Sequence, residues 1–262
     1  MNTIRVFRQG LLLGREGFRQ FWNWRSWTVG WMLRIGSNAF IWVLLGQMLG
    51  AEQKRNFLLI SNAVMAGATG AAVALPAATW ERFDGTHALL VAAPSSMVPA
   101  IIGRTSVWLF HGIATSIATF ALLAGTFGLR MRISTTLLLP LLVTLVCTST
   151  FGLALSLGAV ANVAPRSRNI VQYITVALLT AFCGVSVPVA FWPHWVQLVV
   201  QVMPVTHGLA ATRLLFDNGE TLAILGESMF ELLVGFAWLM LSVVTMDRLA
   251  DAGRVDGSIE LA

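Results

Sequence analysis

The segment GVSVPVAFWPHWVQLVVQVMP, Gly184–Pro204, decides the fold of this chain because it is largely apolar and yet prolines interrupt it at 188, 193 and 204. It contains no Asp, Glu, Lys or Arg. Proline removes a backbone donor and its ring clashes with the preceding turn, so it ends or kinks a helix. Inside a bilayer, a carbonyl group left without a partner costs several kcal/mol. One straight spanning helix is therefore not expected here.

The composition of the whole chain predicts a membrane protein. Of the 262 residues, 56% are hydrophobic and only 11% are charged, and the mean hydropathy is +0.76. A soluble domain carries roughly 25% charged residues, which help to cover its surface. Ten tryptophans against one tyrosine suit the bilayer interface. The net charge of +5 is typical of the positive-inside bias, and no basic cluster is interleaved with aromatics as nucleic-acid binding would require.

Six segments are long and apolar enough to cross a bilayer, which takes about 20 residues. No internal repeat or low-complexity tract is visible, so we expect one membrane domain over residues 1–262. The predicted fold class is an all-α integral membrane protein with six transmembrane helices. The predicted spans are residues 27–49, 57–80, 98–127, 135–161, 170–187 and 222–246.

The prolines divide residues 188–218 into two short pieces, near 192–203 and 205–216. At 1.5 Å per residue each piece covers roughly 18 Å, less than the roughly 30 Å hydrocarbon core. Two such pieces enter and leave the same leaflet if the chain reverses near Pro204. We therefore predict a re-entrant helical hairpin over residues 188–218 on the outer side. The alternative is an ordinary kinked span, which makes seven spans and puts the termini on opposite sides.

The distribution of basic residues predicts the orientation. With six spans both termini share one side, and that side holds eleven arginines against five basic residues on the other. This bias predicts that both termini are cytoplasmic. Residues 1–24 form a separate amphipathic helix suited to the inner interface, either as a lever for a cytoplasmic partner or as a simple anchor. Its apolar side chains at helical spacing are Ile4, Phe7, Leu11, Phe18 and Trp22.

Small residues recur at every fourth position of the second span, in the row Ala66, Gly70, Ala74 and Ala78. Such rows let helices approach closely in lipid. They indicate packing within the bundle or, alternatively, the contact face of a dimer.

Catalytic and nucleotide-binding motifs are absent from the sequence. A P-loop needs lysine after glycine, and the single lysine, Lys54, follows Gln53. No HExxH, CxxC or GxSxG is present. Cys147 and Cys183 lie in apolar runs and are interpreted as packing residues. We expect no catalytic residue, metal or cofactor in this chain, so any ATP that drives it must bind to another protein.

Polar and aromatic residues inside spans are candidates for a substrate path, because burying polar groups in lipid is costly. Glu227 and Glu231 are one turn apart early in the sixth span, where they mark an outer exit, pair with Arg213 or form an interfacial face. His111 in the third span is interpreted as a buried, hydrogen-bonded histidine, with a proton relay as the alternative. The candidate path residues are Trp31, Asn38, Phe40, Trp42, Glu227 and Glu231.

The order of three features resembles one family. An amphipathic N-terminus is followed by the loop ERFDGTHALLVAAP after the second span and by VSVPVAFWPHWVQLVVQVMPVTHGLAATR after the fifth. This arrangement, over nearly the whole chain, resembles the ABC-2 type permeases, which include drug-resistance and nodulation-factor exporters. The hairpin residues that carry the resemblance are Pro188, Trp192, Pro193, Met203, Pro204, His207 and Arg213.

The resemblance implies that two permease halves pair, as a homodimer or with a related permease, and that each half docks on a separate P-loop ATPase subunit that binds ATP and Mg. The loop after the second span would hold a helix that couples to this ATPase. Asp84 or Thr86 suits the cap of such a helix, and Leu89 and Leu90 offer apolar contacts; a plain charged loop is the alternative. The coupling residues implied are Glu81, Arg82, Asp84, Gly85, Thr86, His87, Leu89 and Leu90.

The expected function is therefore the permease subunit of an ATP-driven exporter. Its cargo would be an amphipathic drug, antibiotic, lipid or glycolipid, with export direction taken from the resemblance, and multidrug or antibiotic resistance a possible outcome. The expected location is the bacterial cytoplasmic (inner) membrane, in contact with lipid and not with nucleic acid. Alternatives are an ion-coupled secondary transporter, which usually shows midplane acids and inverted repeats, and a membrane enzyme or scaffold.

Overall fold

The computed structural model describes residues 3–21, 23–48, 52–83, 85, 96–128, 133–162 and 165–256, and within these ranges it contains helices and turns but no strand. Four of the described helices are long and apolar enough to cross a membrane: Lys54–Arg82, Val98–Phe127, Thr136–Ala161 and Thr221–Leu249. The prediction of an all-helical membrane protein is confirmed. The helices are α1 (Thr3–Phe21), α2 (Trp24–Ser26), π-helical η1 (Trp27–Met32), α3 (Leu33–Met48), α4 (Glu52–Ala72), α5 (Ala74–Ala77), α6 (Trp80–Phe83), α8 (Val98–Phe127), α9 (Ile133–Ala161), η2 (Pro165–Ser167), α10 (Arg168–Phe182), η3 (Val189–Phe191), α11 (His194–Val200), α12 (Thr206–Phe216) and α13 (Thr221–Asp256).

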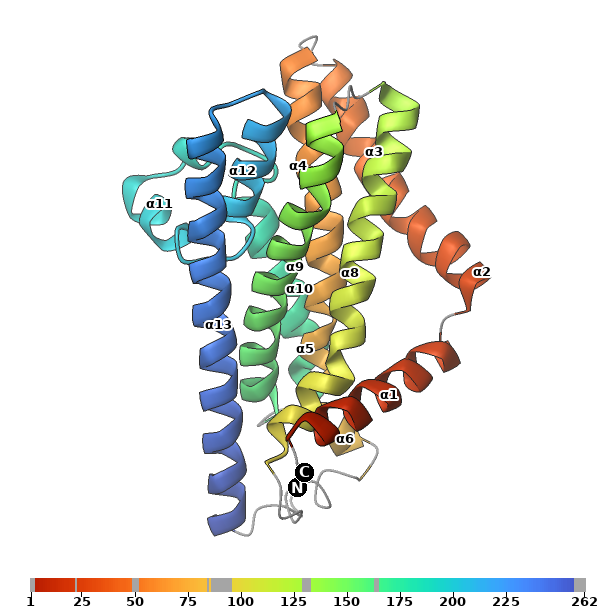
Figure 1. The fold of residues 1–262 in the computed structure, drawn as a ribbon, viewed down its shortest axis with the longest axis vertical. Helices are drawn as coiled ribbons and strands as arrows, with labels where there is room; N and C mark the ends of the chain where they lie inside the picture. Colours follow the sequence, from red (N-terminus) through yellow and green to blue (C-terminus); the bar gives the residue numbers. More distant parts are fainter. Residues whose placement is uncertain are drawn as a thin grey trace.

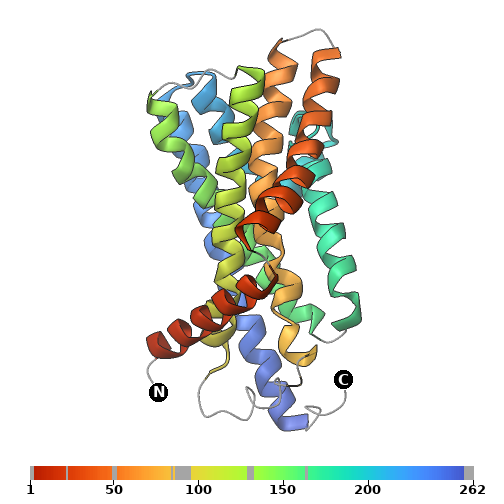
Figure 2. The ribbon, with the colours of Figure 1, turned by 90° about the vertical axis from the view of Figure 1, so that its right-hand side faces the viewer.

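The long helices run side by side and alternate in direction along the long axis of the molecule (Figure 1, Figure 2). α11 and α12 lie at one end of the bundle, beside the start of α13. α1 crosses the opposite end, where α6 and the last turns of α13 also lie. The chain therefore presents two distinct ends, which we call the hairpin end (α11 and α12) and the α1 end.

The predicted first and fifth spans differ from the other four. Residues 27–48 combine the π-helical η1 with α3, and α10 has only 15 residues. At 1.5 Å per residue, α10 covers about 22 Å, less than the roughly 30 Å of a hydrocarbon core. Six spans and a re-entrant hairpin therefore stay predictions.

α10 ends at Phe182, short of the boundary predicted at residue 187. The chain bends at Cys183–Val187 because Gly184 has φ 84, a left-handed conformation that glycine adopts without strain. Pro188 follows with extended backbone, φ −56 and ψ 143. The apolar side chains after Phe182 had suggested a longer helix, since hydrophobicity alone does not report a backbone bend.

The core is built on close contact between α4 and α8. Ala63 and Ala71 of α4 are fully buried, and a Cβ atom added to Gly112 of α8 would lie 2.6 Å from the Gly67 carbonyl oxygen and 2.8 Å from the Ala71 nitrogen. The row Ala66, Gly70, Ala74 and Ala78 is likewise buried within the chain. The small residues of the second span therefore serve packing inside this bundle.

α1 is held against α8 by the same device. Cβ atoms added to Gly10 and Gly14 of α1 would collide with the carbonyl oxygens of Ala100 and Arg104, and one added to Gly103 of α8 would collide with that of Phe7. Backbone therefore meets backbone where the two helices cross. This close approach fixes the amphipathic α1 to the first turns of α8.

Two glycines of α8 provide a matched test of this packing. Gly112→Ala should lower the free energy of unfolding by about 1–3 kcal/mol, because the new methyl group meets the backbone of α4. Gly125→Ala should be neutral or raise it by up to about 1 kcal/mol, because no atom lies within 4 Å of that position and alanine favours helix. SDS titration of the purified protein measures both, and equal effects would contradict the α4–α8 contact.

Candidate functional site

The carboxylate of Glu231 lies at the centre of the hairpin end. Glu231 belongs to α13 and is fully buried. Its Oε1 accepts hydrogen bonds from the Val205 amide nitrogen at 3.0 Å and from the Ser149 hydroxyl of α9. Its Oε2 accepts one from the Gly208 amide nitrogen at 2.9 Å. One side chain therefore joins α13, α9 and the first turn of α12.

α12 depends on Glu231 because it has no cap of its own. The first amide groups of any helix lack partners within the helix, and Ser, Thr, Asp or Asn at the N-cap usually satisfies one of them. Here the N-cap is Val205, at φ 80, without a side-chain cap. A Cβ atom on Gly208 would lie 3.1 Å from Cγ of Glu231. Glycine at this position therefore lets the carboxylate reach the helix.

Glu227, one turn before Glu231, contacts the same segment through His207. The His207 Nδ1 lies 2.7 Å from Oε2 of Glu227, and its Nε2 lies 3.1 Å from the Gln201 carbonyl oxygen. Because a carbonyl oxygen only accepts, Nε2 is the donor in its contact with Gln201, and Nδ1 is the nitrogen that contacts the Glu227 carboxyl group. The imidazole also stacks on Phe230 of α13.

Arg213 fastens the other end of α12. Its guanidinium donates to the Gly184 carbonyl oxygen at 2.6 Å and to the Ser61 hydroxyl of α4, and it lies 3.6 Å from the centre of the Phe57 ring. The glutamates of α13 thus contact His207 and the start of α12, while Arg213 joins α12 to α4 and to the bend after α10. Of the three interpretations left open for the acids, the pairing with Arg213 is not what the structure shows.

The remaining hairpin residues are placed by aromatic and backbone contacts. Trp192 packs on Phe182 with ring centres 4.7 Å apart, and Gln197 donates to the Trp192 carbonyl oxygen at 2.8 Å. The indole of Trp238 in α13 donates to the Val202 carbonyl oxygen at 2.9 Å. Other predicted residues differ in burial: Pro188 and Pro193 are exposed, Met203 is half-buried and Pro204 is buried.

Only part of the predicted coupling segment falls within the described residues. Glu81 is buried and forms an ion pair of 2.9 Å with Arg104 of α8. Arg104 also lies 5.9 Å from the centre of the Trp80 ring. The other predicted residues vary: Arg82 is half-buried, Gly85 is exposed, and Asp84, Thr86, His87, Leu89 and Leu90 lie outside the described residues.

Sequence reasoning missed Arg104 as a partner of Glu81. A charged residue within the apolar third span was the available signal, but spacing along the chain does not show which acid it meets. The ion pair ties α6 to α8 at the α1 end.

The candidate path residues form two separate groups. Asn38 and Phe40 of α3 are exposed on this chain, and Phe40 packs on Phe127 of α8 with ring centres 5.1 Å apart. The side chains of Trp31 and Trp42 lie outside what the structure describes. Glu227 and Glu231 face α12, so they do not join the α3 residues in one site.

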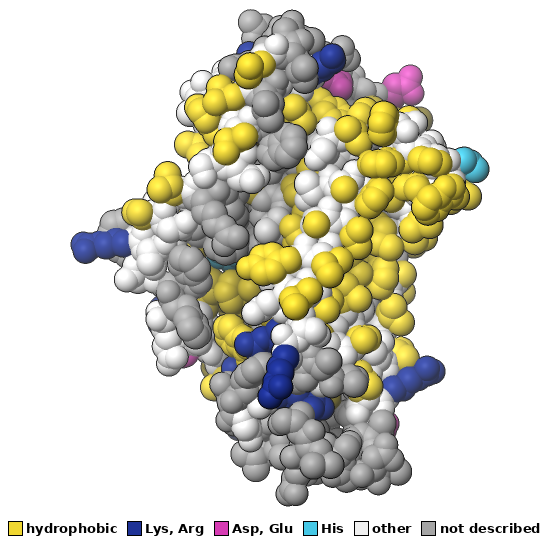
Figure 3. Space-filling view, turned by 180° about the vertical axis from the view of Figure 1, so that it is seen from behind, with side chains coloured by type: hydrophobic (Ala, Val, Ile, Leu, Met, Phe, Trp, Pro, Cys, Tyr) yellow, Lys and Arg dark blue, Asp and Glu magenta, His cyan; other side chains and the backbone are white. Residues whose placement is uncertain are grey.

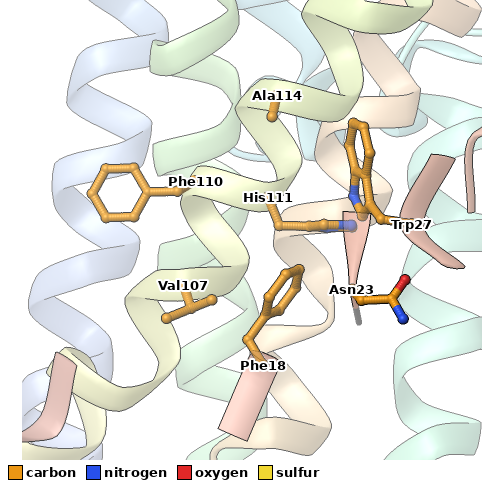
Figure 4. Close-up of a pocket in the computed structure, with 7 residues that line it drawn as sticks. All are labelled: Phe18, Asn23, Trp27, Val107, Phe110, His111 and Ala114. Atoms are coloured by element: carbon orange, nitrogen blue, oxygen red, sulfur yellow. The ribbon is translucent and has the colours of Figure 1, made fainter. Parts of the chain in front are cut away.

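A cavity of about 330 Å³ opens between the end of α1, the start of η1 and α8. Figure 4 shows its lining, with the His111 ring pointing edge-on at Trp27 and Phe18 below them. Beside it, Asn23 and Ser26 cap each other's backbone: the Ser26 amide donates to the Asn23 side-chain oxygen at 2.9 Å, and the Asn23 amide donates to the Ser26 hydroxyl at 3.0 Å. The lining residues are Phe18, Asn23, Trp27, Val107, Phe110, His111 and Ala114.

His111 is buried in this wall among aromatic rings. Its ring centre lies 5.6 Å from those of Phe18 and Trp108 and 6.2 Å from that of Trp27. The ring centres of Phe18 and Trp108 lie 5.5 Å apart. Prediction from sequence placed His111 in the interior, as the structure does. It did not place α1 beside it, because nothing in the amphipathic pattern of residues 1–24 says which helix they cross.

The outer surface is predominantly apolar. Seen from behind, hydrophobic side chains cover much of the face between the two ends, and Lys or Arg side chains lie in its lower part, at its left-hand edge and near the top (Figure 3). Exposed apolar side chains continue along α10 and α13, among them Ile170, Tyr173, Ile174, Leu178, Leu225, Leu232, Leu233, Phe236 and Met240. A surface of this kind suits contact with lipid or with another membrane chain.

A model of the ABC-2 type transporter family matches residues 9–216 of the 262. The chain belongs to the ABC-2 type transporter family. The matched range begins in α1 and includes the segments before α6 and α8, the bend after α10, and α11 and α12. The resemblance inferred from the sequence is thereby confirmed. A search of curated proteins returned no match.

Proposed function

We propose that this ABC-2 permease is the membrane subunit of an ATP-driven exporter, and that a separate P-loop ATPase subunit binds ATP and Mg. Membership of the ABC-2 family carries the proposal. The sequence supports it, because its only lysine, Lys54, follows glutamine and does not complete a P-loop. Hydrolysis therefore needs a partner.

The α1 end is proposed as the ATPase contact. α1, α6 and the start of α8 lie there together, and the ion pair of Glu81 with Arg104 joins two of them. The close helix crossing at the glycines of α1 and α8 joins α1, the third element, to α8. A push on the loop after α6 would move these three elements as one unit, which is what coupling requires.

A partner contact through this loop can be tested with Leu89→Ala combined with Leu90→Ala. If the two leucines fill an apolar cleft of the ATPase, assembly should weaken about tenfold, because loss of a buried anchor commonly costs more than about 1.4 kcal/mol. Co-purification and ATP hydrolysis in the reconstituted complex measure this. Leu225→Ala, an exposed position on α13, is the control. Unchanged assembly of the double variant would argue for a plain surface loop.

We further propose six spans, an outer hairpin end and cytoplasmic termini in a bacterial inner membrane. The proposal is supported by α1 and the last turns of α13 lying at the same end, opposite α11 and α12. The arginine bias of that end agrees with a cytoplasmic position.

Single cysteines with a membrane-impermeant maleimide test this topology. Cysteine at Glu220, exposed at the hairpin end, should react in intact cells. Cysteines at Gln9 and Asp251, both exposed, should react only after permeabilisation. The native Cys147 and Cys183 are buried and should stay unlabelled. Labelling of Gln9 and Asp251 from opposite sides would instead support seven spans.

Two permease halves, identical or related, are proposed to form the path between them. Asn38 and Phe40 are exposed on this chain, so they are accessible to a second copy or to lipid. Glu231 does not suit an ion relay, because three donors already occupy its two oxygens. Proton-driven transport without any ATPase would contradict this view and favour a secondary transporter.

The cavity beside α1 supports an amphipathic cargo. It is lined mainly by apolar side chains and lies next to a helix whose exposed face carries Arg15 and Arg19. Its volume is at the lower end of the roughly 300–1,000 Å³ of typical ligand sites. We propose that this cavity receives the apolar tail of a single-chain lipid or lipid-like cargo, at the depth of the inner headgroups.

Filling this cavity should weaken amphiphile binding. Ala114→Phe places a ring in the cavity and should raise the Kd for a fluorescent lysophosphatidylglycerol about tenfold in fluorescence polarisation. Ala121→Phe, two turns further along the same face of α8 and equally exposed, should leave it within about twofold. Equal binding by the two variants would remove the cavity from the cargo route.

A further inference from the structure

We propose that Glu231 is a positioning residue that clamps α11 and α12 to α13, so that these three helices move as one body during transport. The transport part of this inference rests on the proposed exporter function; the clamp itself does not. The contacts that carry it converge on one face of α13 and come from a segment that lacks its own helix cap.

The first contact that holds α12 to α13 is the helix cap that Glu231 of α13 supplies to α12. The amide of Val205, the N-cap residue of α12, the amide of Gly208 in its first turn and the Ser149 hydroxyl all donate to Glu231, and both carboxyl oxygens are used. The positive end of the α12 dipole faces this carboxyl group. If α12 left α13, a buried carboxylate and two amide groups would lose their partners in apolar surroundings, which is strongly unfavourable. Separation is therefore opposed by the cap itself.

Two further contacts lie on the same face of α13, on either side of Glu231. Glu227 binds His207 and the Trp238 indole binds the Val202 carbonyl oxygen. Positions 227, 231 and 238 are spaced by four and seven residues, which places them along one helix face over roughly 16 Å. The attachment is therefore distributed along α13 and resists rotation as well as separation.

α9 extends the same body. The Ser156 hydroxyl donates to the Trp238 carbonyl oxygen at 2.9 Å, and a Cβ atom on Gly235 would lie 3.0 Å from the Ser149 Cβ. α13, which has 36 residues in all, runs on to the α1 end, where the Ser96 hydroxyl donates to Oδ1 of Asp247 at 3.3 Å. Ser96 directly follows the undescribed residues 86–95. Movement at that end thus has a continuous helical route to the hairpin end.

The clamp predicts how distances respond to nucleotide. Spin labels at Trp195→Cys in α11 and Phe236→Cys in α13, both exposed positions, report the distance between the two helices. In the wild-type background this distance should be the same in nucleotide-free and vanadate-trapped complexes. In Glu231→Gln, which loses one acceptor, the distance distribution should broaden or gain a second population.

Matched variants separate positioning from general stability. Glu220→Gln makes the same change at an exposed acid just before α13 and should leave the distances unchanged. Trp238→Phe keeps an aromatic ring but removes the Val202 bond, and it serves as the second variant if Glu231→Gln does not fold. The distribution of the α11–α13 distance should broaden in Trp238→Phe as it does in Glu231→Gln.

The transport readout is the number of cargo molecules moved per ATP. It should fall at least about tenfold in Glu231→Gln while ATP hydrolysis stays within about twofold, because the ATPase contact lies at the other end. Purely structural damage would lower assembly and hydrolysis together.

The distance and transport results have separate meanings. A wild-type distance that changes with nucleotide, or unchanged distances in both Glu231→Gln and Trp238→Phe, would overturn the clamp. A chain that moves no cargo with any ATPase would overturn the proposed function instead. The distance distributions of the wild type, Glu231→Gln and Trp238→Phe can still be compared then, without nucleotide, on the isolated chain in nanodiscs.

Discussion

The whole hairpin end depends on satisfying backbone groups where water is scarce. Three prolines prevent the segment after α10 from continuing as one helix, and each break releases amide or carbonyl groups that lipid cannot satisfy. Side chains elsewhere in the fold supply the missing partners. Glu231 accepts from the Val205 amide at the start of α12, Arg213 donates to the Gly184 carbonyl oxygen, and Trp238 donates to the Val202 carbonyl oxygen. The broken segment is consequently stable only when docked.

The same constraint divides the molecule into two kinds of interface. Glycines bring the backbones of α1 and α8 into direct contact at the α1 end, and those of α8 and α4 into contact further along the bundle, so these helices are held by packing. At the hairpin end, a buried carboxylate and a guanidinium hold shorter helices by hydrogen bonds. Packing of close backbones transmits force without specific partners, whereas a polar clamp joins particular elements.

The predictions from sequence succeeded where a local pattern carries the information. Apolar length predicted the four described helices that are long enough to span a membrane, while the other two predicted spans stay predictions. The prolines predicted the breaks around α11 and α12, and motif order predicted the family. They failed at the end of α10, because Gly184 bends a stretch whose hydrophobicity does not change. Glu227 and Glu231 were recognised as unusual, but their partners His207, Val205 and Gly208 are too distant in sequence for spacing to reveal.

The sequence by itself determined that this chain is an all-helical membrane protein of the ABC-2 type, because composition, segment length and proline positions are properties of the chain alone. Only the tertiary structure decided what its few buried polar groups do. Glu231 meets α12, Glu81 meets Arg104, and α1 meets α8 to form a cavity beside His111. The physical reason is that a buried polar side chain can only bind a group on a neighbouring helix. Which helices are neighbours depends on the packing of the whole bundle.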